Sequence, residues 1–156
     1  MRGLERLRRF FSSDRHAVAG AASIELAIIA PVLVAALICT VDLGFGIYRS
    51  MQVEAAAQAG ANYAVVRGFT PAGVTSAVAS ATSLGGVQAV PAPVQFCGCA
   101  FAGGVANAAC GQPCPDGTAP GTYVTVSAQA NYSTLLPYPM FPNTFVFAAQ
   151  STVRTQ

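Results

Sequence analysis

The chain has little charge and few of the side chains that enzymes use for catalysis. Only 9% of its 156 residues are charged, and lysine is absent, whereas about 25% of an average soluble domain is charged. The single histidine, His16, lies near the N-terminus. Because no histidine follows it, the rest of the chain cannot form a Ser–His or Cys–His pair. These absences predict a protein that is not an enzyme.

The carboxylates and arginines that follow Gly20 are few and scattered. The acids are Glu25, Asp42, Glu54 and Asp116, and their spacing offers no paired carboxylates for acid–base catalysis. No glycine-rich stretch adjoins a lysine, so no phosphate-binding loop is present. Three arginines beyond Gly20 cannot make a basic surface for nucleic acid. We therefore expect no cofactor and no nucleic-acid partner.

The cations gather instead in a short leader before a long apolar run. Five of the eight arginines lie in the first fifteen residues, and the sixteen residues Leu26–Val41 carry no charge. This asymmetry predicts a single-pass membrane helix with its N-terminus in the cytoplasm and its C-terminal part outside. A cleaved secretory signal would place its small-residue cut after the apolar run. Here the small-residue bond, Gly20–Ala21, precedes it, so cleavage would keep the helix in the mature protein.

One carboxylate, Glu25, lies at the start of this apolar run. A charge in the middle of a bilayer costs roughly 2.5–3.5 kcal/mol on insertion scales. One hypothesis is that Glu25 has a function that justifies this cost. The other is that it is an interfacial charge tolerated near the membrane edge.

Three stretches of the chain carry a resemblance to a known family. They are GAASIELAIIAPVLV at residues 20–34, Asp42-Leu43-Gly44, and AAAQAGANYAVV at residues 55–66. They resemble the TadE-like minor pseudopilins of the Tad/Flp pilus system, which is related to type IV pili. The resemblance covers about Gly20 to Arg67 and implies a structural subunit of a pilus or related secretion apparatus used in adhesion.

The resemblance also implies roles for individual residues. A prepilin peptidase would cut after Gly20 and leave Ala21 as the new N-terminus. Glu25, five residues past the glycine, would then pair with the Ala21 amine of a neighbouring subunit during filament assembly. Leu26 stands in the adjoining assembly position, where pilins of this system commonly have Phe or Tyr.

The implied partners follow from the same family. They are the prepilin peptidase, other pilin and pseudopilin subunits, an inner-membrane assembly platform and membrane lipid. The implied location is the bacterial inner membrane, with the N-terminus cytoplasmic and the C-terminus periplasmic, from which the subunit can enter an extracellular pilus.

Residues 21–67 are predicted to form one long helix, which spans the membrane at about residues 21–41. Pro31 is tolerated because a membrane helix can lose one backbone hydrogen bond, and Gly68 is expected to end the helix. Beyond the membrane, six residues are predicted to form the face that packs on a sheet: Tyr48, Met51, Ala55, Ala59, Tyr63 and Val66. Ser50, Glu54 and Gln58 form a polar stripe elsewhere on the helix.

Residues 68–156 are predicted to form a small α+β head, which with the long helix gives a pilin-like fold built on a mainly antiparallel sheet. Thr70 and Pro71 indicate a second helix over 71–84. Residues 87–95 are expected to form an edge strand because they contain two prolines. Alternation predicts further strands at 121–132 and 145–154, joined by a proline-rich loop at 136–143.

Four of the five cysteines, Cys97, Cys99, Cys110 and Cys114, fall within eighteen residues of each other. An extracytoplasmic location favours two disulfides that cross-link the pair 97/99 to the pair 110/114, and the pattern leaves the two cross-pairings open. A zinc site of four thiolates is the alternative, although its spacing departs from paired C-x2-C motifs. Cys39 lies in the membrane run and is expected to be a small apolar residue.

Two other functions fit the same residues. One is an unprocessed single-pass anchor whose cysteine-stapled head binds a partner. The other is a membrane-tethered zinc module.

Overall fold

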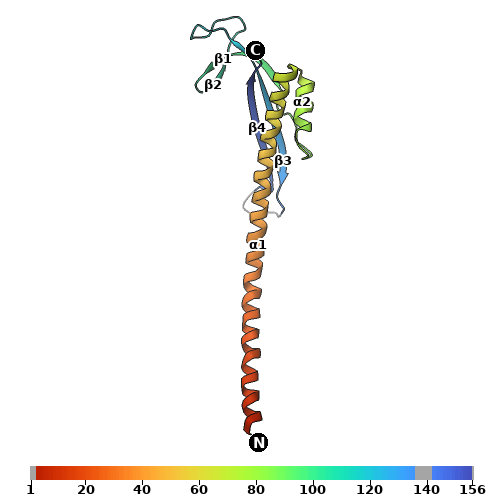
Figure 1. Ribbon diagram of the computed structural model, residues 1–156, viewed down its shortest axis with the longest axis vertical. Helices are drawn as coiled ribbons and strands as arrows, with labels where there is room; N and C mark the ends of the chain where they lie inside the picture. The colour runs from red at the N-terminus through yellow and green to blue at the C-terminus, as the bar shows by residue number, and fades with distance from the viewer. Residues whose placement is uncertain (1–2, 136–141, 156) are drawn as a thin grey trace. The chain divides into compact units, whose positions relative to one another are not determined.

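The computed structural model describes the backbone of residues 3–135 and 142–155, and side chains from residue 23 onward. Figure 1 shows a long helix followed by a short helix and a four-stranded sheet. In chain order the elements are α1 (Gly3–Arg67), α2 (Pro71–Ser80), β1 (Val94–Phe101), β2 (Gly104–Asn107), β3 (Gly121–Ser133) and β4 (Thr144–Arg154). The fold class is α+β with an antiparallel sheet, as the sequence predicts.

Helix α1 ends where the sequence predicts and begins earlier. It ends at Arg67, and Gly68 follows with φ of 82°, a left-handed conformation that glycine adopts without steric cost. At the other end the helix continues back through the basic leader to Gly3. Pro31 lies inside it without ending it. The chain divides into two compact units, Met1–Leu43 and Gly44–Gln156.

The sheet of the second unit is antiparallel throughout, with strand order β2-β1-β3-β4. β3 and β4 form its longest pair, which runs from Tyr123 opposite Arg154 to Ser133 opposite Thr144. Both strands agree with the segments predicted from alternation. Residues 136–141 of the proline-rich connection lie outside the described residues.

The predicted edge strand at 87–95 is wrong in position. Most of this segment has no regular structure, apart from an isolated bridge between Gln88 and Gln129. The strand begins at Val94, immediately after the last proline, and runs to Phe101. It lies inside the sheet, between β2 and β3. The physical reason is that Pro91 and Pro93 have no N–H to donate, so ladder pairing starts only beyond them.

Helix α2 is shorter than predicted: it ends at Ser80, and bends follow at residues 81–84. Its start agrees with the sequence. Thr70 occupies the N-cap position with extended backbone, Pro71 follows at the start of the helix, and the Thr70 carbonyl accepts a hydrogen bond from the Val74 N–H at 3.0 Å. The Thr70 hydroxyl makes no capping bond.

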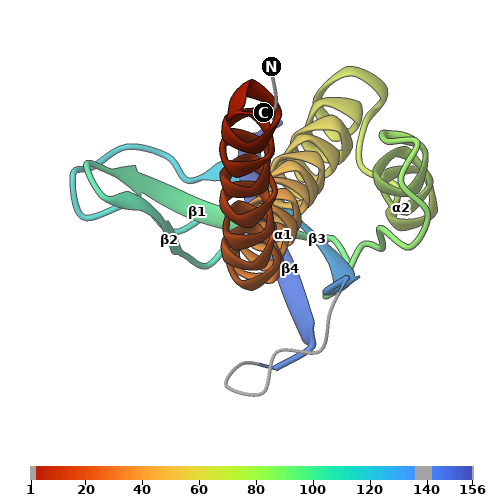
Figure 2. The same cartoon turned by 90° about the horizontal axis from the view of Figure 1, so that it is seen from below.

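The core of the second unit lies where α1, α2 and the sheet meet, and Figure 2 shows α1 crossing the sheet with α2 beside it. Gly60 of α1 marks the closest approach. A Cβ placed on Gly60 would lie 2.5 Å from Val78 Cγ2 on α2 and 2.9 Å from Val126 Cγ1 on β3. Only a residue without a side chain fits there.

The face of α1 predicted to pack on the sheet is wrong. Tyr48 is 48% exposed, Met51 63% and Val66 78%, while Tyr63 and Ala59 are partly buried and Ala55 is exposed. The face that is buried consists of small residues and one valine: Val53, Ala56, Ala57, Gly60, Ala61 and Ala64. Small side chains allow the helix axis to approach the sheet closely, and this favours the alanine face over the bulkier one. The polar stripe of Ser50, Glu54 and Gln58 is exposed, as predicted.

Candidate functional site

The predicted processing site lies within the regular helix. Gly20 and Ala21 are in α1, and the helix continues through them without a break. Glu25 and Leu26 follow on the same helix, and both are exposed. The structure therefore places the four residues in one continuous segment, with the Glu25 carboxylate accessible. Their roles in cleavage and assembly stay predictions.

The apolar stretch that follows has the surface of a membrane helix. Its large side chains are mostly exposed, for example Leu26 at 64%, Ile28 at 70% and Leu37 at 65%. In the described chain one helix is long and apolar enough to cross a membrane, and none of its most apolar eighteen-residue window is buried. A helix in the core of a soluble domain would instead bury such residues. The chain thus has a single-pass membrane anchor near its N-terminus.

Two acids flank the apolar stretch and have different environments. Glu25 is exposed at its start, whereas Asp42, just past its end, is only 5% exposed. The sequence itself carries no signal for this difference between the two acids. Burial of an acid depends on tertiary structure, which a single sequence does not reveal.

The head carries two disulfides that join β1 to the connection between β2 and β3. Cys97 pairs with Cys110, with Cα atoms 5.3 Å apart, and Cys99 pairs with Cys114, with Cα atoms 5.8 Å apart. The expected cross-pairing is confirmed, and the structure decides between its two forms. Cys97 and Cys99 lie on β1, and Cys110 and Cys114 lie in the connection that follows β2.

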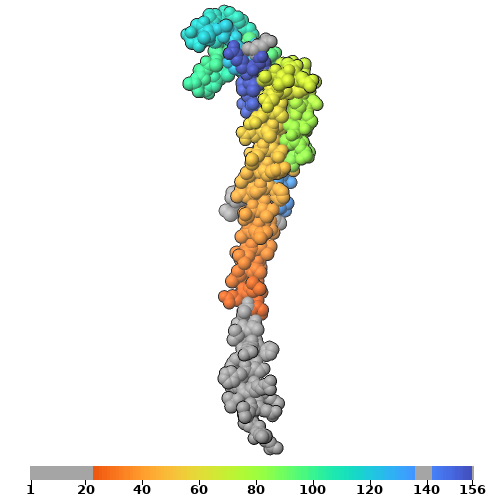
Figure 3. Space-filling view, in the orientation of Figure 1, coloured from red at the N-terminus to blue at the C-terminus, as the bar shows by residue number. Residues whose placement is uncertain are grey.

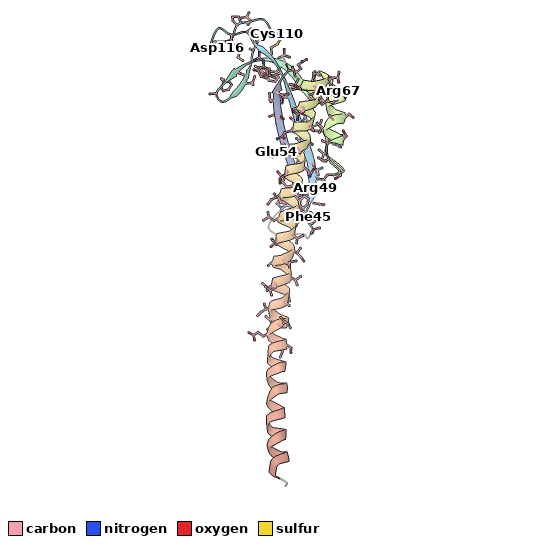
Figure 4. The ribbon with its side chains drawn as sticks, in the orientation of Figure 1. Phe45, Arg49, Glu54, Arg67, Cys110 and Asp116 are labelled. Carbon is pink, nitrogen blue, oxygen red and sulfur yellow. A yellow bond between two sulfur atoms is a disulfide. The ribbon has the colours of Figure 1, made fainter. Side chains whose placement is uncertain are left out.

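A local turn adds to the disulfide-stapled connection. The Cys114 N–H donates to the Thr118 carbonyl at 2.8 Å. The Asp116 carboxylate accepts from the Thr118 hydroxyl at 2.7 Å and from its N–H at 3.0 Å. These bonds favour the ionised acid and hold the pKa of Asp116 below its ordinary value. Figure 4 shows Asp116 and Cys110 in this connection.

The disulfides bear directly on the zinc alternative. All four thiols that a zinc site would require are joined in pairs, and a disulfide sulfur cannot supply the thiolate ligand that zinc prefers. The fifth cysteine, Cys39, is free and exposed on the apolar segment. Within the described residues, no group of three or more metal-ligating side chains comes together.

Part of the exposed surface of α1 in the head is apolar. It includes Tyr48, Met51 and Val66, which the helical spacing predicted to pack on the sheet. Figure 3 shows this stretch of α1 exposed beside α2. The spacing of apolar residues along α1 is compatible with two apolar faces, one with the alanines and one with Tyr48, Met51 and Val66. Only the packed structure shows which of the two faces is buried.

Comparison with known proteins finds a family match that lies within α1. The family model of the TadE-like proteins matches residues 20–62. Searches of curated proteins and of solved structures gave no significant match. The matched segment begins at the predicted cut site, includes the whole membrane anchor and Asp42, and ends among the alanines that pack on the sheet.

Proposed function

Because residues 20–62 identify the chain as a TadE-like protein, we propose that it is a minor pseudopilin, a structural and non-enzymatic subunit of a Tad/Flp-type pilus or related secretion apparatus. The observation that carries the proposal is the exposed apolar stretch of α1 that follows Gly20 and holds one accessible acid, Glu25. Lipid covers such a surface before assembly, and the helices of other subunits can cover it afterwards.

In this proposal a prepilin peptidase cleaves after Gly20. Cleavage removes the basic leader and leaves Ala21 at the start of α1, which then carries a free amine. Glu25 lies one helical turn further along, and its carboxylate pairs with the Ala21 amine of a neighbouring subunit. In an apolar surrounding this ion pair offsets part of the cost of burying both charges, and it sets the axial register between subunits.

The sidedness of the chain is part of the same proposal. The arginine-rich leader stays in the cytoplasm, and the head is exported to the periplasm. The two disulfides support this orientation because such bonds form and persist in oxidising compartments. The assembly platform of the inner membrane and the other pilin subunits are the proposed partners.

The test of cleavage is the mass of the chain after co-expression with its cognate prepilin peptidase. We expect a mature N-terminus at Ala21, and no change in mass when Gly20→Val is expressed in the same way. An unchanged mass for the wild type would show that cleavage does not occur and would favour an unprocessed membrane-anchored binding protein.

The test of assembly compares two acids on the same helix. Glu25→Ala should prevent incorporation into the filament and leave membrane insertion intact. Glu54→Ala is the matched control, because Glu54 is an exposed acid of α1 in the head. Equal incorporation of the two variants would show that Glu25 has no role in assembly.

A further inference from the structure

The two edges of the head sheet are very different. β2, at one edge, has four residues and lies beside the disulfide-stapled connection, whereas β4, at the other edge, has eleven. Natural proteins usually shorten an edge strand, bend it with a bulge, or place proline or charge on it, because an open edge accepts strands from other chains. β2 is protected by its shortness.

The hydrogen bonds show which backbone groups of β4 point away from the sheet. The Thr155 N–H donates to the Thr122 carbonyl at 2.9 Å, and the register continues in steps of one residue along the whole pair. In an antiparallel ladder every second residue bonds to its neighbour strand. The odd-numbered residues of β4 therefore bond to β3, and the even-numbered ones direct their N–H and C=O groups outward.

Four of these outward residues, Val146, Ala148, Gln150 and Thr152, form the open edge. All four are exposed, Val146 by 64%. Among the described residues, none of the four has a backbone hydrogen bond to a segment outside the sheet. The opposite side of β4 is occupied, because Phe147, Ala149 and Val153 pack against the core.

None of the usual protective devices is present on β4. Residues 144–153 contain no charge, proline or glycine. The pairing with β3 is unbroken over eleven residues, so there is no bulge. The first charge is Arg154, at the end of the strand. An edge of this length and composition is suited to binding another strand.

We propose that the edge of β4 is a strand-addition site for an extended, uncharged segment of a different polypeptide, paired antiparallel along residues 144–152. The pattern of β4 specifies the partner. Partner residues next to Phe145, Phe147 and Ala149 would lie on the core side of the sheet and be apolar. Partner residues next to Val146, Ala148, Gln150 and Thr152 would lie on the solvent side and be polar. The proposal concerns the head and does not depend on cleavage at Gly20 or on Glu25.

A second copy of this chain is the weaker occupant. Figure 1 shows β4 running in the same direction as the part of α1 beside it. An antiparallel β4–β4 pair would therefore make these helix segments of the two copies run in opposite directions. Copies inserted in one membrane with the same sidedness run in the same direction, so a segment from another protein fits better.

The test uses the full-length chain in detergent micelles and a synthetic peptide with the sequence of residues 123–133. This segment of β3 is uncharged, alternates, and already pairs with β4 on its inner side. We expect the peptide to slow amide exchange at least tenfold at residues 146, 148, 150 and 152. A scrambled peptide of the same composition should have no such effect.

Two variants at one position sharpen the test. Ala148→Pro removes an outward N–H and keeps the bonds to β3, so it should weaken peptide binding at least tenfold. Ala148→Val keeps the N–H and should bind as the wild type does. Amide protection of the odd-numbered residues of β4 reports whether each variant is folded.

Three results would overturn the proposal. One is no protection of the wild-type edge by the peptide. Another is protection of the same four amides in the chain alone, either within a monomer or through β4–β4 dimers. The third is equal binding by folded Ala148→Pro and Ala148→Val. The exchange measurement on the wild type decides the matter even if the proline variant does not fold.

Discussion

The two parts of α1 use apolar residues in opposite ways. Between residues 23 and 43 most of the large apolar residues are exposed, such as Ile28 and Leu33. Between residues 44 and 67 the buried ones are small, such as Ala57 and Ala64. A membrane segment gains from large apolar surface in contact with lipid, whereas a helix on a sheet gains from close approach. Side-chain size therefore separates the side of α1 that packs on the sheet from the surface that the anchor exposes.

The largest effect should come from removing the disulfides of the head while leaving the anchor cysteine in place. Each bridge closes a loop, with 13 residues of separation for Cys97–Cys110 and 15 for Cys99–Cys114. Each is expected to stabilise the head by about 3 kcal/mol. Replacing all four cysteines with serine should therefore unfold the head or lower its urea midpoint greatly. Cys39→Ser is the control and should leave the urea midpoint unchanged. A large effect of Cys39→Ser would contradict the conclusion that only the head depends on its cysteines.

A charge placed on each part of α1 should separate the lipid-facing surface from the water-facing one. Leu33→Asp places a charge in the middle of the apolar segment and should cost about 2.5–3.5 kcal/mol of insertion free energy. Val65→Asp lies on the exposed surface of the head helix, where Val65 is 49% exposed, and should insert normally. The fraction of chain resistant to alkaline extraction measures both. Normal insertion of Leu33→Asp would show that the segment does not span the bilayer.

Two glycines of α1 test the close approach to the sheet. Gly60→Val would drive the new side chain into Val78 and Val126 and should destabilise the head by about 2–3 kcal/mol. Gly44→Val meets nothing within 4 Å of its Cβ. The control should be close to neutral in thermal unfolding followed by circular dichroism. Similar losses for both variants would show that helix propensity, and not packing, is responsible.

A smaller effect should distinguish the buried face of α1 from the open one. Val53 is 1% exposed and Met51 is 63% exposed, although they are two residues apart. Val53→Ala should cost about 2 kcal/mol, from lost burial and the cavity that remains. Met51→Ala should change the unfolding free energy by less than about 0.5 kcal/mol. A larger loss of unfolding free energy for Met51→Ala than for Val53→Ala would show that the face predicted from the helical spacing is the buried one.

The smallest effect is the pH dependence of the turn at Asp116. Its folded pKa lies below the ordinary value of 3.8, first because of the hydrogen bond from the Thr118 hydroxyl and next because of that from the Thr118 N–H. The resulting stabilisation is fully present above the ordinary pKa and is lost as pH falls through the lowered one. Acidification in that range should therefore lower the thermal midpoint of the wild type slightly more than that of Asp116→Asn. Identical acid profiles would show that the turn does not contribute.

The local features of the fold could be predicted from residue patterns. Alternation of residue types predicts β3 and β4, although only β4 has one clearly exposed side, while β3 is buried or half-buried along most of its length. Gly68 predicts the end of α1, and Thr70 with Pro71 predicts the start of α2. The spacing and expected compartment of the cysteines predict cross-paired disulfides. All of these features depend on a few neighbouring residues, so the chain itself carries the signal.

Other features were decided only by the tertiary structure. Val53 and Met51 are both apolar, and the sheet and α2 determine which of them is buried, because close approach requires the alanine and glycine side of the helix. The disulfide partners of Cys97 and Cys99 depend on how the connection between β2 and β3 passes beside β1. The open edge of β4 depends on strand order. The sequence alone thus determined an α+β chain with an N-terminal anchor and a disulfide-stapled head, and packing between distant segments determined which of its surfaces stay open.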